Sequence, residues 1–120
     1  RDDADFTPLE TIVKQITKRV LDDGLPKGVC LNVNFPLGQT FKGVKVARMA
    51  RGTWTNEVVR CRHPRGYDYY WMTGEYINDE PAADDTDNWA LTHGYVAITP
   101  TQVDVTSYEM IEQMKDWKLG

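Results

Sequence analysis

The stretch VCLNVNFP, residues 29–36, decides the fold of this chain. Its odd-numbered residues are apolar, whereas the even-numbered residues 30, 32 and 34 are Cys or Asn. This alternation predicts a strand over residues 29–35 that has one apolar face. Pro36 and Gly38 are typical of the turn that ends such a strand.

An amphipathic helix is predicted immediately before this strand. Apolar residues recur at helical spacing over residues 9–20. Thr7 fits the N-cap position, with Pro8 as the first helical residue and Glu10 completing a capping box. Gly24 fits the end of the helix. A helix that leads directly into a strand is one step of an α/β layer, so we expect the α/β class.

Four further strands are predicted, over residues 43–50, 54–62, 67–77 and 95–99, the last stopped by Pro100. The turn residues His63-Pro64-Arg65-Gly66 predict that the middle two form a long antiparallel hairpin. A second capping box at Thr106 and Glu109 predicts a helix over residues 107–117.

We interpret residues 1–120 as one portion of a single domain, because no repeat or low-complexity linker divides them. The parts expected are a helix and strand of the α/β core (1–40), a hairpin extension (41–78), an acidic loop and strand (79–100), and a C-terminal arm (101–120). The chain opens on Arg1 and reaches a helix signal almost at once, so we expect that it begins within a longer protein.

Composition narrows the functional classes. The net charge of −4 over 120 residues argues against a general nucleic-acid binder. No apolar run approaches the roughly 20 residues of a membrane span, so no membrane partner is expected. Cys30 and Cys61 belong to no metal-ligand pattern, and they are interpreted as reduced thiols of a cytoplasmic protein.

Charge is unevenly distributed along the chain. Residues 42–66 hold seven Lys or Arg against Glu57 alone, and residues 68–88 hold seven Asp or Glu and no Lys or Arg. The two blocks are expected to attract each other, either within one chain or between copies.

Two acidic clusters are candidates for metal sites. Asp22-Asp23-Gly24 could hold a divalent ion, but it follows a helix and is better explained as the helix end. The spacing of Asp84, Asp85 and Asp87 does not match a calcium loop, so a mobile solvated loop without metal is expected over residues 78–88. His63 among three arginines is interpreted as an exposed hairpin tip rather than a phosphate grip.

Three segments together resemble the SurE family. They are LPxGxxLNVNFP at residues 25–36, YYWxxG at 69–74, and DTDxxAxxxGYVAITP at 85–100. The resemblance implies the C-terminal half of a 5′/3′-nucleotidase that hydrolyses nucleoside monophosphates with a divalent cation, Mg or Mn. It also implies a Rossmann-like α/β sandwich with an extended hairpin and a C-terminal arm used in oligomers. The family's metal ligands lie in its N-terminal half, so neither metal nor catalytic residues are expected within this chain.

Some residues are nevertheless expected near the substrate. Open α/β sheets bind ligands at the carboxyl ends of their strands, which favours Asn34 at the end of its strand. Thr86 and Asp87 are expected in a loop near the same rim. The arm is expected to dock on another subunit of a dimer or tetramer, although docking within one chain fits the sequence equally well. Asp104 is expected to fix its bend, and its apolar stripe is Met110, Ile111, Met114 and Trp117. The alternative function is a non-catalytic oligomerisation module.

Overall fold

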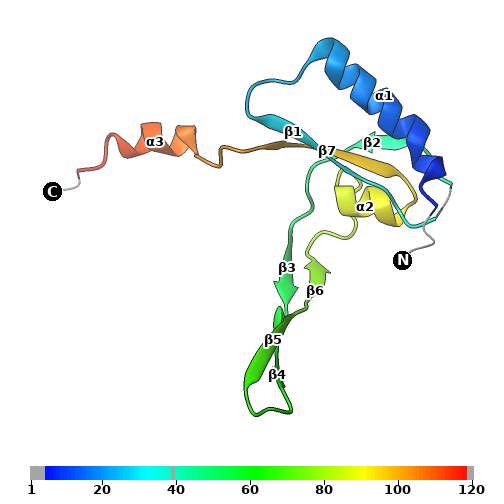
Figure 1. Ribbon diagram of the computed structural model, residues 1–120. Coiled ribbons are helices and arrows are strands. Elements are labelled where there is room, and N and C mark those ends of the chain that lie inside the picture. Colours follow the sequence, from blue (N-terminus) through cyan, green and yellow to red (C-terminus); the bar gives the residue numbers. More distant parts are fainter. Residues whose placement is uncertain (1–4, 39, 119–120) are drawn as a thin grey trace.

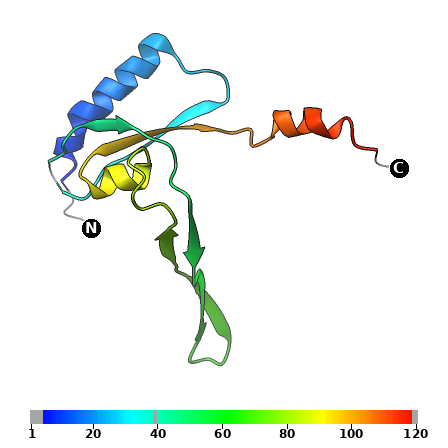
Figure 2. The ribbon, with the colours of Figure 1, turned by 180° about the vertical axis from the view of Figure 1, so that it is seen from behind.

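A three-stranded mixed sheet forms the body of the molecule, and a hairpin and a helical arm project from it (Figure 1). The computed structural model describes residues 5–38 and 40–118, so the opening residues 1–4 lie outside the part described. The α/β class is confirmed. The radius of gyration is 20.2 Å, whereas a compact domain of this length has roughly 14 Å. The shape is therefore far from globular, as the view from behind also shows (Figure 2).

The sheet has the strand order β1-β7-β2, with bounds β1 Val29–Asn34, β7 Val96–Gln102 and β2 Val44–Val46. β1 pairs antiparallel with β7, and β2 pairs parallel with it. β7 runs through Pro100 rather than stopping there, which corrects the sequence prediction. Pro100 is tolerated because β2 ends at Val46, opposite Ile98, so the missing N–H faces no strand.

Helix α1, Thr7–Asp23, lies over one face of the sheet (Figure 1). Phe6, not Thr7, occupies the N-cap, and the backbone N–H of Thr7 donates instead to Asp5 Oδ1 at 2.9 Å. Gly24 ends the helix at φ 74°, as predicted. None of its residues is buried, so α1 stands off the sheet and leaves an apolar hollow of about 330 Å³ beneath it.

Helix α2, Asp87–Thr92, packs closely against the opposite face of the sheet. Thr86 caps it by accepting from the backbone N–H of Trp89 at 3.2 Å. The buried apolar residues of the described chain all lie at this contact or beside it. They are Ala47, Ala90, Val96 and Ala97.

The predicted hairpin is confirmed, but each of its two long strands is divided in two. β3, Gly52–Thr55, pairs with β6, Glu75–Asn78, and beyond them β4, Val58–Arg62, pairs with β5, Asp68–Met72. The break falls at Asn56, with φ 53°, and at Gly74, with φ 142°. Positive φ lies outside the strand region, so the ladder cannot continue through these residues.

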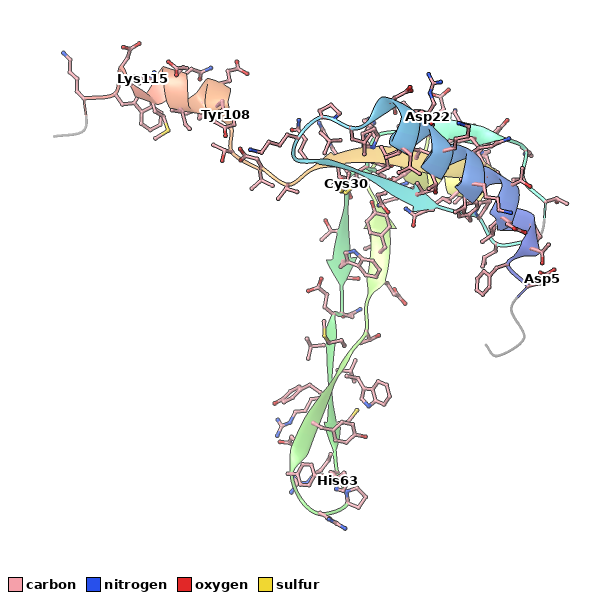
Figure 3. All side chains as sticks on the ribbon, turned by 45° about the horizontal axis from the view of Figure 1, so that its top comes forward. Asp5, Asp22, Cys30, His63, Tyr108 and Lys115 are labelled. Carbon is pink, nitrogen blue, oxygen red and sulfur yellow. The ribbon has the colours of Figure 1, made fainter. Side chains whose placement is uncertain are left out.

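The C-terminal arm carries helix α3, Tyr108–Met114, which lies far from the sheet (Figure 1). Ser107 is its N-cap, and the Ser107 hydroxyl accepts from the N–H of Met110 at 3.3 Å. The cap was predicted at Thr106, one residue before its actual position. The helix also ends at Met114 rather than Trp117. Figure 3 shows Tyr108 and Lys115 well away from Cys30 in the sheet.

Candidate functional site at the hairpin root

The hairpin joins the sheet where the chain leaves β2, and the loop before α2 returns to the same place. Arg48 and Thr86 form an isolated parallel bridge there. The N–H of Arg48 donates to the Asp85 carbonyl at 3.0 Å, and the N–H of Asp87 donates to the Arg48 carbonyl at 2.9 Å. The two segments are separated by 37 residues in sequence and are held together by their backbones.

Arg48 also ties the acidic loop to the body through its guanidinium. It donates to both oxygens of Glu80, at 2.5 and 3.0 Å, and to both oxygens of Asp85, at 2.8 and 3.0 Å. Arg48 and the backbone N–H of Arg51 lower the pKa of Glu80 to about 2. The same guanidinium lowers the pKa of Asp85, and the two carboxylates raise the pKa of Arg48.

The expected mobility of residues 78–88 therefore needs correction, because this loop is anchored. The predicted attraction between the charge blocks is seen within one chain, at Arg48 and also at Arg60, which lies 2.5 Å from Asp68 in the hairpin. All three ion pairs join an arginine of the basic block to a carboxylate of the acidic block.

Two side chains at the start of α2 complete the root. Asp87 Oδ1 accepts from the N–H of Ala50 at 2.8 Å and from that of Asn88 at 2.7 Å. Asn78 Nδ2 donates to Asn88 Oδ1 at 3.0 Å, while Asn78 Oδ1 accepts from the N–H of Glu80 at 2.9 Å.

Ala50, Asp87 and Asn88 border a hollow of about 370 Å³ between the hairpin and α2. Its walls include the rings of Trp54 and Tyr76, whose centroids are 5.6 Å apart. Volumes of this order are at the small end of ligand pockets. The hollow is the candidate binding site of the described chain.

The three residues expected near the substrate are not brought together. Asp87 lines the hollow, whereas Thr86 is completely buried as the cap of α2 and donates to the Ala83 carbonyl at 2.9 Å. Asn34 lies at the carboxyl end of β1, opposite Ala97. Because β1 is antiparallel to β7, the carboxyl end of β1 lies beside the amino end of β7. The position of Asn34 at the carboxyl end of a strand therefore does not bring it to the hairpin root.

The acidic pair at the end of α1 forms ion pairs along its own helix. Asp22 pairs with Lys18 and Asp23 with Arg19, both at 2.6 Å and both one helical turn away (Asp22 is labelled in Figure 3). Within residues 5–38 and 40–118, no three His, Cys, Asp or Glu side chains are grouped to hold a metal. Asp22 and Asp23 are thus explained as the end of a helix.

The two histidines of the chain, His63 and His93, also have local explanations. His93 is the C-cap of α2 and stacks on Trp89 at 3.8 Å between ring centroids. His63, at the hairpin tip in Figure 3, stacks on Tyr67 at 4.4 Å, and its Nδ1 accepts from the N–H of Arg65 at 3.1 Å. His93 Nδ1 lies 2.8 Å from the Trp89 carbonyl oxygen and 3.2 Å from the Thr92 hydroxyl, and that hydroxyl donates to the carbonyls of Asn88 and Trp89 within the same short helix.

The arm presents the apolar stripe expected from the sequence. Asp104 Oδ1 accepts from the N–H of Thr106 at 2.9 Å, and Asp104 Oδ2 accepts from the hydroxyl of Tyr108. These bonds lower the pKa of Asp104 to about 2, and the bond from Tyr108 raises the pKa of that phenol. Between 37% and 51% of each stripe residue is exposed, the stripe being Met110, Ile111, Met114 and Trp117.

Sequence reasoning missed the residues that build the hairpin root. In the sequence, Arg48 and Glu80 stand out only as members of the two charge blocks, and Trp54 and Tyr76 only as aromatic residues of predicted strands. Their partners lie 22 to 37 residues away along the chain, so no local spacing connects them. The one local signal was Asp87-Asn88 directly after a helix cap.

Comparison with known proteins agrees with this fold. The family model described as "Survival protein SurE" matches residues 1–56. "5'-nucleotidase SurE" of Phocaeicola vulgatus is 54% identical over 117 residues, which is 98% of this chain and 46% of that protein. The Bacteroides fragilis protein of the same name is 46% identical, over 97% of this chain and 46% of its own length.

The solved structures include a close match in fold. The crystal structure of the SurE protein from Aquifex aeolicus superposes with a TM-score of 0.66 at 33% identity, covering 96% of this chain and 47% of that one. The class is thus an α/β sheet that carries a projecting hairpin and arm. The chain belongs to the SurE family, and it spans about half the length of the relatives it matches. No helix among the described residues is long and apolar enough to cross a membrane.

Proposed function

We propose that this chain is the C-terminal half of a 5′/3′-nucleotidase that hydrolyses nucleoside monophosphates to nucleoside and phosphate. The observation that carries the proposal is that relatives matching 97–98% of the chain bear the name 5'-nucleotidase SurE. The motifs quoted from residues 25–36, 69–74 and 85–100 support it.

The reaction of the full-length protein requires a divalent cation, Mg or Mn, and we propose that all of its ligands lie outside this chain. The acidic pair Asp22-Asp23 is occupied by Lys18 and Arg19, which supports this division. We assign no catalytic residue to the chain itself. Its contribution is the sheet, the hairpin root and the arm.

We further propose a cytoplasmic homo-oligomer, either a dimer or a tetramer. Cys30 and Cys61 are both free thiols, as a reducing compartment favours. The exposed apolar stripe of the arm supports assembly, since apolar surface gains about 25 cal/mol per Å² when it is buried. This stripe also favours the second candidate function, a non-catalytic oligomerisation module.

The two functions are separated by assaying phosphate release from nucleoside monophosphates with Mg or Mn. The full-length protein is expected to turn over and the purified chain of residues 1–120 to be inactive. An inactive full-length protein would leave only the oligomerisation module. Turnover by residues 1–120 that is lost in the double variant Asp22→Ala/Asp23→Ala would refute the assignment of the metal ligands to the other half.

A further inference from the structure

The hollow at the hairpin root presents one hydrogen-bond acceptor and one donor that the protein does not use. Asp87 Oδ1 is occupied by the N–H groups of Ala50 and Asn88. Among residues 5–38 and 40–118, Asp87 Oδ2 has no hydrogen-bond partner. The carboxylate is therefore held by one oxygen and offers the other.

The orientation of the Asn88 amide follows from its neighbour. Asn78 Oδ1 must be the acceptor because it receives the N–H of Glu80, so Asn78 Nδ2 is the donor to Asn88 Oδ1. Asn88 Nδ2 is then the free end, and it too has no partner in the described part of the chain. An acceptor and a donor thus stand on consecutive residues.

Aromatic rings form another wall of the same hollow. Trp54 is 56% exposed and lies beside Tyr76, at an interplanar angle of 53°. The hydroxyl of Tyr76 donates to the Ala50 carbonyl at 3.3 Å. A Cβ on Gly52 would lie only 2.5 Å from the Tyr76 ring, so glycine is what allows this ring to sit against β3. The aromatic wall is therefore fixed in place.

The charges around this hollow do not favour the binding of a phosphate group. No Lys or Arg is among the described residues that line the hollow, and the guanidinium of Arg48 at the hairpin root is already paired with Glu80 and Asp85. The free oxygen belongs to a carboxylate, which repels a phosphate. A flat, uncharged ring with a hydrogen-bonding edge matches the hollow better, because aromatic side chains stack on the faces of bases.

We propose that this hollow binds the adenine ring of a nucleoside monophosphate, an inference that rests on the proposed function. The ring stacks against Trp54, its 6-amino group donates to Asp87 Oδ2, and its N7 accepts from Asn88 Nδ2. Bidentate reading of adenine by one donor and one acceptor is a common geometry in base recognition.

The decisive experiment compares AMP with IMP in the full-length protein, because the two differ at the group that faces Asp87. In Asp87→Asn, Oδ1 still accepts from both N–H groups and the amide nitrogen takes the place of Oδ2. That nitrogen donates to the 6-oxo group of IMP but not to the 6-amino group of AMP. The AMP-to-IMP ratio of kcat/KM is expected to fall about tenfold or more.

Asp84→Asn is the matched control, since this exposed carboxylate does not line the hollow, and it should leave both substrates unchanged. An unchanged ratio in Asp87→Asn would overturn the adenine assignment. If the wild-type protein releases no phosphate from any ester, including p-nitrophenyl phosphate, the proposed function itself fails.

A second variant covers the case in which Asp87→Asn does not fold. Trp54→Leu keeps an apolar side chain but removes the stacking face, whereas Trp54→Phe retains one. Trp54→Leu should raise KM for AMP about tenfold relative to Trp54→Phe, because stacking on an aromatic ring contributes appreciably to base binding. Equal KM values in the two variants would also overturn the inference.

Discussion

At the scale of single residues, the hairpin root is held by polar side chains that each bind more than one partner. Arg48 satisfies two carboxylates at once, and Asp87 Oδ1 satisfies two backbone N–H groups. Charge-assisted, bidentate contacts of this kind fix direction as well as adding stability. They join the base of the hairpin to the loop that precedes α2.

The ion pair between Glu80 and Arg48 predicts that the stability of the folded protein depends on pH. Its pKa falls from the ordinary 4.5 to about 2 in the folded protein. The stabilisation it provides is therefore present above the unfolded value and is lost as the pH falls from about 4.5 through 2. The difference in unfolding midpoint between the wild type and Glu80→Gln should shrink over this range.

Chemical denaturation of the full-length protein between pH 6 and pH 2 would measure this difference. Glu109→Gln, on the exposed arm helix, is the matched control and should show no comparable trend. A difference between wild type and Glu80→Gln that stays constant across the range would contradict the pairing.

The surroundings of Gly52 leave no room for a side chain, so a substitution there is expected to cause a steric clash. An added methyl group would lie 2.4 Å from the Ile77 carbonyl oxygen and 2.5 Å from the Tyr76 ring, so the β3–β6 ladder would have to shift. Gly52→Ala should lower the free energy of unfolding by about 1–3 kcal/mol, the usual cost of overpacking. Thr53→Ala, exposed on the same strand, should change it by no more than about 0.5 kcal/mol.

At the scale of elements, the hairpin and the arm have little of their own surface buried in this chain. Most large apolar side chains of β4, β5 and α3 are exposed, including Val58, Trp71 and Met72 at 61%, 62% and 90%. Single exposed apolar residues are ordinary, but a continuous series along a projecting element is typical of an interface. The hairpin and the arm are therefore the elements from which assembly is expected.

The arm gives a direct test of assembly. Met114→Ala together with Trp117→Ala should lower the oligomeric state of the full-length protein, because these two side chains supply much of the exposed stripe. Gln113→Ala on the same helix is the control and should leave assembly intact. Size-exclusion chromatography with light scattering reports the mass. A wild-type protein that is monomeric at high concentration would disprove the docking of the arm on another subunit.

At the scale of the whole molecule, the described chain has an open core. Only four apolar residues are buried, and the face between α1 and the sheet is a hollow lined by side chains such as Ile16, Val20 and Ile98. Val46 on that face is 73% exposed. The relatives are about twice as long as this chain, which accounts for a core that is not closed.

The open face predicts that residues 1–120 in isolation bind the dye ANS, whereas the full-length protein does not. ANS fluoresces when it binds exposed apolar surface. Val46→Asn should reduce the signal of the isolated chain more than Val105→Asn on the arm does, because only Val46 lines the hollow. Equal fluorescence from the isolated chain and the full-length protein would contradict the prediction that the rest of the protein covers this face.

The sequence by itself determined the elements that depend on local rules. The alternation at residues 29–35, the glycine after α1, and the turn at residues 63–66 each act over a few residues, and all three predictions were confirmed. The boundaries were less exact. Thr7 and Thr106 were each one residue from the true cap, because neighbouring polar residues compete for the same backbone N–H groups.

Only the tertiary structure decided which strands are neighbours, and with them the site. The direction of β1 relative to β7 separates Asn34 from the hairpin root, although both lie at strand ends. Arg48, Glu80 and Asp85 meet across 32 and 37 residues, and Trp54 meets Asp87 in one hollow. Such contacts depend on how the chain crosses between strands, a choice that no local spacing of residues encodes.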